Sequence, residues 1–165
     1  MNYYLKENFR FLYHKGLLFD EEGIVAYEFE ASTVMFPRLH LYRFGKEIGQ
    51  VKKNFTLFLS QYDIDLYGEF SDSLQQELTF FKSRLYLENR GWQIKGDFFA
   101  WNYEIVDREG YILCSVHEKL FHLTKHFEIQ VYDEDNQDLL LLMVLAIFLF
   151  DKEKDSNSAA AAASH

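Results

Sequence analysis

The 165-residue sequence lacks several features on which small domains often depend. It contains one cysteine, Cys114, so no internal disulfide can form and no cysteine-based zinc site can be assembled. Cations are scarce, because 17 Lys and Arg stand against 26 Asp and Glu, which gives a net charge of −9. This charge argues against a general nucleic-acid binder and against broad adsorption to anionic lipid. The longest apolar run, Leu139–Phe150, is shorter than the roughly 20 residues that a bilayer-spanning helix needs.

The composition is that of a folded domain. Hydrophobic residues make up 48% of the chain and aromatic residues 18%, and a chain of this length can bury about 68–70% of its unfolded surface. Residues 1–18 mix charged and aromatic side chains and contain no apolar segment typical of a signal peptide. Together with the single cysteine, this predicts a cytoplasmic protein. We assign residues 1–154 to one domain and interpret the Ser/Asn/Ala-rich stretch 155–165 as a disordered tail or a cloning remnant.

Polar turn signals recur at even intervals along the domain. Several of them close on a glycine, which can supply the positive φ that a hairpin loop requires. The six stretches are Asp20–Gly23, Phe44–Lys46, Tyr67–Gly68, Asn89–Gly91, Asp107–Gly110 and Asp133–Asn136.

A second set of chain reversals, rich in Phe, Leu and Tyr, lies between the polar turns. Two of these aromatic corners, 55–64 and 78–87, match at an offset of 23 residues and share a Thr, a Phe and a Ser. Shorter corners occur at 9–12, 34–36, 98–105 and 120–129.

A longer self-similarity indicates an internal duplication. A shift of 65 residues places 26–66 over 91–131 without a gap, so that Arg43 meets Arg108. Few residues are identical, but the apolar register holds throughout. The alternative is the partial self-match that any all-β sequence gives.

Six turns and six corners predict about twelve short antiparallel strands. Apolar and polar residues alternate in Tyr62–Leu66, Tyr103–Ile105 and Phe127–Val131, which is typical of a sheet with one buried face. Because an open sheet of this size would leave costly edges, we expect a closed β-barrel. Strand side chains alone cannot fill a barrel this wide.

The apolar run Leu139–Phe150 is the predicted filler of the barrel. It is rich in helix formers, and a helix that is apolar on all sides must be buried on all sides. Its length of about 18 Å is enough to pass through a small barrel. Asp138 lies where an N-cap is needed, and Lys152 and Lys154 follow at the opposite end. The alternative, a buried central strand, disagrees with the length and the Leu/Met/Ala composition.

Two stretches, Gly91–Ala100 and Tyr103–Ile105, resemble the LURP-one-related family, a branch of the proteins related to the Tubby C-terminal domain. The opening Tyr3–Phe9 and the final Leu-rich run are similar to the two ends of that family. The likeness extends over about residues 1–154. It implies a mainly β fold, in which about twelve antiparallel strands close around a hydrophobic C-terminal helix.

The resemblance implies less about function. Tubby domains bind phosphoinositide head groups through a basic surface pocket, and phospholipid scramblases share the fold. This sequence offers no matching basic cluster, because Lys52-Lys53 is its only adjacent basic pair and we interpret it as a solvated strand end. The cysteine cluster and terminal membrane helix of scramblase-type anchoring do not occur in it.

No catalytic residue, metal site or cofactor is predicted. His117, His122 and His126 lie in a strand–corner–strand pattern, where side chains four residues apart need not converge as they do on a helix. The acidic stretch Asp133–Asp138 lacks the glycine and the distal glutamate of a calcium loop, which favours a polar turn and helix cap. Cys114 lies in an apolar strand, where we expect a buried, inert thiol.

The leading interpretation is a non-enzymatic binding or scaffold module, either cytoplasmic or peripheral at a membrane. Its candidate ligands are a phosphoinositide or other phospholipid head group and a protein partner, and nucleic acid is not expected. Two alternatives stay open: an enzyme with a surface site of carboxylates and histidines, and a carrier that opens around a hydrophobic ligand. A pocket of convergent titratable groups would favour the enzyme, a basic patch the lipid binder, and a void beside the helix the carrier.

Overall fold

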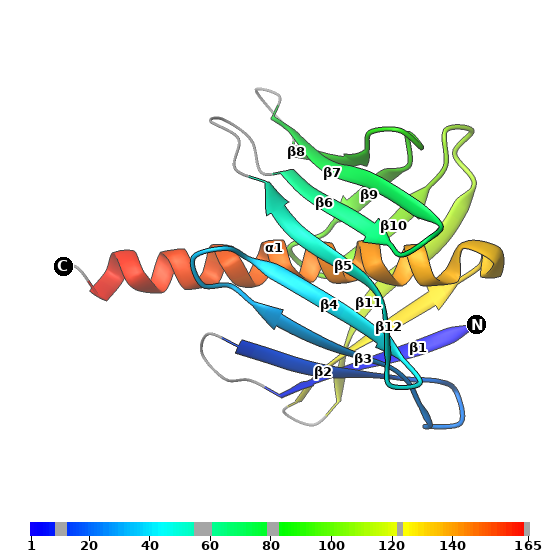
Figure 1. The fold of residues 1–165 in the computed structure, drawn as a ribbon, viewed down its shortest axis with the longest axis horizontal. Coiled ribbons are helices and arrows are strands. Elements are labelled where there is room, and N and C mark those ends of the chain that lie inside the picture. Colours follow the sequence, from blue (N-terminus) through cyan, green and yellow to red (C-terminus); the bar gives the residue numbers. More distant parts are fainter. Residues whose placement is uncertain (9–12, 55–60, 79–82, 122–123, 164–165) are drawn as a thin grey trace.

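The structure, a computed structural model, describes residues 1–8, 13–54, 61–78, 83–121 and 124–163. Twelve antiparallel strands form one closed barrel around a C-terminal helix, which confirms the predicted fold class (Figure 1). The strands follow one another in chain order, and β1 closes the barrel against β12. The elements are β1 (Asn2–Asn8), β2 (Tyr13–Phe19), β3 (Val25–Ser32), β4 (Arg38–Arg43), β5 (Lys46–Asn54), β6 (Gln61–Leu66), β7 (Phe70–Leu78), β8 (Ser83–Leu87), β9 (Gln93–Asp97), β10 (Asn102–Val106), β11 (Ile112–Phe121), β12 (Thr124–Val131), the 3-10 turn η1 (Glu134–Asn136) and α1 (Gln137–Ala163).

The strands bury one face, as their alternating sequences predict. Along β6, Tyr62, Ile64 and Leu66 are buried, whereas Asp63 and Asp65 between them are partly exposed. The inward side chains of the strands and the apolar part of α1 form a single hydrophobic core.

The two sets of chain reversals lie at opposite ends of the barrel. Each even-numbered strand up to β10 joins the next strand through a predicted polar turn, and each odd-numbered strand joins the next through an aromatic corner. Gly45 and Gly110, with φ of 73° and 93°, show why the turns need glycine, since positive φ is costly for other residues. We call the end with these turns and the start of α1 the polar end, and the opposite end the corner end.

The structure describes two of the predicted corners, at 33–37 and 98–101. The corner residues 9–12, 55–60, 79–82 and 122–123 lie outside the described residues.

The barrel consists of two corresponding halves, which supports the predicted duplication. A shift of 65 residues maps β5 and β6 onto β11 and β12, with buried positions on buried positions. Strand β4 maps onto β10 with a shift of 64, because the β9–β10 connection is one residue shorter than the β3–β4 connection. The ungapped match is therefore wrong in this strand. A β-bulge occurs at equivalent places, between Leu41 and Tyr42 in β4 and between Ile105 and Val106 in β10.

Helix α1 passes through the barrel and fills it, as predicted. Every residue from Leu139 to Leu149 is at most 2% exposed. Phe148 packs edge-on against Phe29 and Trp101, with ring centroids 5.4 and 5.9 Å away. Burial of a large apolar side chain contributes about 1.5–3 kcal/mol, so this helix is a major part of the core.

Tyrosines from the strands hold α1 at both ends of the barrel. At the polar end the Tyr27 hydroxyl donates to Asp138 Oδ1, and Arg43 Nη1 lies 3.3 Å from the same oxygen. At the corner end the Tyr62 hydroxyl donates to Glu153 Oε2 at 2.5 Å. Burial and the adjacent carboxylate raise the pKa of both tyrosines above its usual value, so both hydroxyls keep the proton that they donate.

The start of α1 differs from the prediction by two residues. The helix begins at Gln137, so Asp138 lies within its first turn and is not the N-cap. The carboxylate of Asp138 binds Tyr27 and Arg43 from β3 and β4 instead of capping the helix.

The end of α1 lies well beyond the predicted one. The helix continues to Ala163, so Lys152 and Lys154 lie inside it and not at its C-terminus. Residues 155–163, which the composition assigned to a disordered tail, are therefore helical, since a run of alanines readily extends an existing helix. This part of α1 projects beyond the strands at the corner end (Figure 1).

Candidate functional site at the polar end of the barrel

A pocket of about 310 Å³ opens at the polar end, where α1 begins. Its wall combines the β6–β7 turn, η1, the first residues of α1, an arginine from the end of β4 and an arginine from the β8–β9 turn. The polar lining residues are Arg43, Glu69, Arg90, Glu134, Asp135, Asn136, Gln137 and Asp138.

Arg90 is held in the pocket wall by two rings and an amide. Its guanidinium carbon lies 4.5 Å from the centroid of Phe70 and 4.8 Å from that of Trp92. Its Nη1 donates to Asn136 Oδ1 at 2.8 Å. Because a cation–π contact contributes about 0.5–1 kcal/mol at an exposed site, these contacts fix the guanidinium at the edge of η1.

A buried carboxylate, Asp72, shapes the β8–β9 turn that carries Arg90. It accepts hydrogen bonds from the backbone N–H groups of Asn89 and Arg90, at 2.9 and 3.1 Å, and from the Asn89 side chain at 3.0 Å. Asp72 is 5% exposed. It lies on β7 opposite Ile64, just as Tyr3 lies on β1 opposite Ile129, so Asp72 and Tyr3 hold equivalent positions in the two halves of the barrel. One half thus uses this inward position to organise a turn, and the other half uses it for the core.

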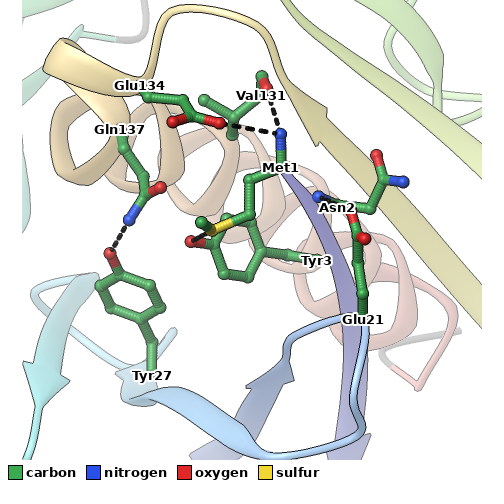
Figure 2. A network of polar contacts seen from close by, with 8 residues as sticks. All are labelled: Met1, Asn2, Tyr3, Glu21, Tyr27, Val131, Glu134 and Gln137. Carbon is green, nitrogen blue, oxygen red and sulfur yellow. Dashed lines mark hydrogen bonds and ion pairs between the residues drawn. The ribbon is translucent and has the colours of Figure 1, made fainter.

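The chain's first residue joins the same end of the barrel (Figure 2). The Met1 ammonium donates to Val131 O at 2.8 Å and lies 3.5 Å from Glu134 Oε1. Gln137 Nε2 donates to the Tyr27 hydroxyl at 2.7 Å. These contacts tie η1 and the start of α1 to β1, β3 and β12, so the pocket has a well-supported wall.

The pocket is polar but not cationic. Its two guanidinium groups lie among four carboxylates, and Arg43 already contacts Asp138 while Arg90 already bonds to Asn136. A phosphate head group needs cations that can neutralise it. The arrangement suits a ligand with hydrogen-bond donors or positive charge better than it suits a phosphate.

Cys114 is buried, which confirms the expectation for this thiol. Burial raises its pKa to about 12. The thiol therefore stays protonated at neutral pH and is a poor nucleophile, because thiolate is the reactive form.

The candidate histidines do not form a metal site in the described part of the chain. His117 Nδ1 lies 2.8 Å from Asn102 Oδ1 on the exposed face of the barrel, His126 lies on β12, and His122 is outside the described residues. Within the described ranges, no group of three His, Cys, Asp or Glu side chains could hold a metal ion. That the chain binds no metal stays a prediction.

The acidic stretch and the basic pair have structural roles. Asn136 Nδ2 donates to Asp133 Oδ2 at 2.8 Å in the turn before α1, in line with the predicted polar turn. Lys52 is exposed, as expected of a solvated strand end. Lys53, in contrast, is partly buried and forms an ion pair with Glu153 of α1, so the prediction is wrong for this residue.

The stretch Gly91–Ala100 builds the β8–β9 turn, β9 and the following corner. Gly91 and Gly96 have φ of 68° and 109°. A Cβ would lie 2.5 Å from Arg108 Nε at the first position and 2.6 Å from Asn102 O at the second, so both positions need glycine. The stretch that carries the resemblance is thus constrained by the barrel itself.

The family model for LURP-one-related proteins matches residues 1–150. The chain belongs to the LURP-one-related family. The match spans all twelve strands and the apolar part of α1, which confirms the resemblance and places this LURP-one-related domain among Tubby-C-like barrels. No curated protein and no solved structure matches the chain significantly. In the described ranges, no helix is both long enough and apolar enough to span a bilayer.

The sequence gives little indication of the two pocket arginines. In the sequence, Arg43 stands out only because the internal duplication aligns it with Arg108. The side chain of Arg108 has a different role, because it donates to Arg90 O at 2.9 Å and to Asn89 O at 2.7 Å. Arg90 precedes the conspicuous Gly91-Trp92 pair. An arginine at a hairpin turn is normally a solvated residue, so neither could be singled out before the turns were placed around α1.

Proposed function

We propose that this LURP-one-related chain is a non-catalytic binding module that attaches peripherally to a phospholipid membrane on its cytoplasmic side. The observation that carries the proposal is the filled barrel, in which Leu139–Leu149 are buried. A hydrophobic ligand carried inside would have to displace α1 and expose this run to water. Recognition on the outer surface is therefore favoured over the carrier alternative.

Two observations support a lipid as the ligand. The Tubby domains that this barrel resembles bind phosphoinositide head groups. The domain also leaves large apolar side chains in water at the corner end, where Met35 is 79% and Phe36 58% exposed. Because the pocket arginines already have partners, attachment is expected to depend on apolar contact more than on charge.

Vesicle flotation tests this function. The purified chain is mixed with vesicles of phosphatidylcholine alone, with added phosphatidylserine, or with an added phosphoinositide. We expect flotation with little general preference for phosphatidylserine, since the net charge of −9 provides no overall attraction to anionic lipid. A chain that floats with none of these vesicles, or that adsorbs to any anionic vesicle and detaches steeply with salt, contradicts the proposal.

A basic protein partner is the second candidate, and the polar end favours it. The six connections at that end contain ten carboxylates and two arginines. The same connections also expose aromatic side chains, with Phe44 90% and Tyr111 72% exposed. Aromatic side chains surrounded by charge of one sign suit a partner of the opposite charge. Crosslinking in cells that captures a basic partner from the parent chain, but not from a Phe44→Asn, Tyr111→Asn variant, would support this candidate.

A further inference from the structure

We propose that the tip of the β3–β4 hairpin, Val34–Phe36, inserts into the lipid bilayer, with Arg38 and Lys52 at the level of the head groups behind it. This inference rests on the proposed membrane function and names the surface that performs it.

The tip presents consecutive apolar side chains to water. Val34, Met35 and Phe36 are 42%, 79% and 58% exposed. The backbone holds them in a defined turn, in which Phe36 N donates to Val34 O at 2.6 Å and Lys53 N donates to Pro37 O at 2.9 Å. A shaped apolar tip loses little conformational freedom when it enters a membrane interface.

Met35 adopts a backbone conformation that would suit a polar residue better. Its φ is 53°, in the left-handed region that Gly, Asn and Asp occupy most easily. A methionine at this position costs backbone free energy and exposes a thioether, and the fold gains no core contact in return. An apolar side chain kept at such a site indicates a role outside the folded domain itself.

Two cations lie directly behind the tip. Arg38 and Lys52 are neighbours across β4 and β5, and both side chains are exposed. Within the described residues neither takes part in an ion pair, although Lys52 lies opposite Asp63 across β5 and β6. An apolar tip followed by cations matches the bilayer interface, where hydrocarbon is followed by phosphate.

The charges of the two barrel ends also favour an orientation in which the corner end faces the membrane. In sequence, the six connections at the corner end contain no Asp or Glu, whereas those at the polar end contain ten. These connections therefore bring no carboxylate to the proposed contact; α1 carries Asp151, Glu153 and Asp155 at this end, with Lys152 and Lys154 between them.

The equivalent connection in the other half is built differently. There the rings of Phe98 and Phe99 lie 4.3 Å apart, and Phe99 lies 5.9 Å from Phe150 of α1. Phe99 is 39% exposed but packs against the ring of Phe150 on α1. Because α1 also projects past the strands at the corner end (Figure 1), the barrel meets the bilayer with its axis tilted and the β3–β4 side first.

A lipid surface fits this tip better than a protein does. The apolar side chains lie on a projecting hairpin and not in a groove, so a protein partner would need a pocket shaped to receive them. A bilayer accepts such a tip without shape complementarity.

Matched substitutions at the two ends of the barrel test the inference. Phe44 is the control for Met35, because it is an exposed apolar tip at the polar end with nearly the same φ, 52°. Asparagine is tolerated at both positions, so Met35→Asn and Phe44→Asn should fold like the parent, which thermal melting checks. We expect Met35→Asn to weaken binding to phosphatidylcholine vesicles at least about tenfold, and Phe44→Asn to leave it unchanged.

A polarity-sensitive fluorophore gives a second readout. It is attached to Met35→Cys or Phe44→Cys in a Cys114→Ser background, and the emission of the first alone should shift to the blue when vesicles are added. If the parent chain binds no vesicle, the proposed function and this inference both fail. If the parent binds but Met35→Asn binds equally well, or if only the probe at position 44 responds, the inference alone is wrong and another partner covers the tip.

Discussion

Asp72 shows how strongly one inward carboxylate organises the polar end. Asp72→Ala removes the acceptor of the backbone N–H groups of Asn89 and Arg90 and of the Asn89 side chain. A hydrogen bond to a charged group contributes about 1.5–3 kcal/mol, and water can replace these partly buried bonds only in part. We therefore expect the free energy of unfolding to fall by about 2–3 kcal/mol, out of the roughly 5–15 kcal/mol typical of a domain.

Urea unfolding followed by tryptophan fluorescence measures this change, since Trp92 lies next to the affected turn. Asp65→Ala is the control, because Asp65 lies on the outward face of β6 and accepts one long bond, from Gln50 Nε2 at 3.3 Å. It should change the free energy of unfolding by less than about 0.5 kcal/mol. Equal effects of the two substitutions, or an unchanged midpoint for Asp72→Ala, would refute the role assigned to Asp72.

Three further predictions concern the core. Leu145→Asp places an unpaired carboxylate at a fully buried position of α1 and should abolish folding, whereas a cooperative melt of this variant in circular dichroism would disprove the internal-helix core. Burial, with Lys152 nearby, lowers the pKa of His14 below the value of about 6.5 in the unfolded chain. The contribution of His14 to stability is therefore complete above pH 6.5 and is lost as the pH falls below it. Urea unfolding at pH 7.5 and at pH 5.5 measures this, and the free energy of unfolding should change less between the two pH values in His14→Phe than in the parent. Cys114→Ser should lower stability modestly at most and leave vesicle binding intact. Neither zinc nor a chelator should change the melting temperature of the parent. A large loss of stability on chelation would instead favour the enzyme alternative.

The strands and turns were predictable because their signals are local. Alternation in Tyr62–Leu66 reports directly which side chains face the core. A glycine with positive φ, such as Gly45, marks a tight turn from the sequence alone. The apolar run Leu139–Phe150 could be placed inside the barrel because no other location would bury all of its faces.

The ends of α1 and the register of β4 were not predictable from such signals. Asp138 is bound by residues of β3 and β4, which lie far away in the sequence. The helix continues through 155–163 because it is already formed, although that stretch has no apolar face of its own. In β4, a connection that differs by one residue between the halves changes the alignment while the apolar pattern still looks continuous.

The candidate site depends almost wholly on long-range contacts. Arg90 meets Asn136 across 46 residues, and Arg43 meets Asp138 across 95. No spacing motif can report such pairs, because the barrel brings together turns that are remote in sequence. The β3–β4 tip was visible as an aromatic corner, but the exposure of Met35 depends on how that corner folds.

The central claim is that α1 fills the barrel permanently and that ligands bind outside it. Hydrogen exchange of the backbone amides of Leu139–Leu149, with and without phosphatidylcholine vesicles, tests this claim most directly. We predict that these amides exchange only through global unfolding and that vesicles do not accelerate them, while protection increases around Val34–Phe36. Faster exchange in α1 on vesicle binding would mean that the helix leaves the barrel, and would contradict the account in favour of a carrier.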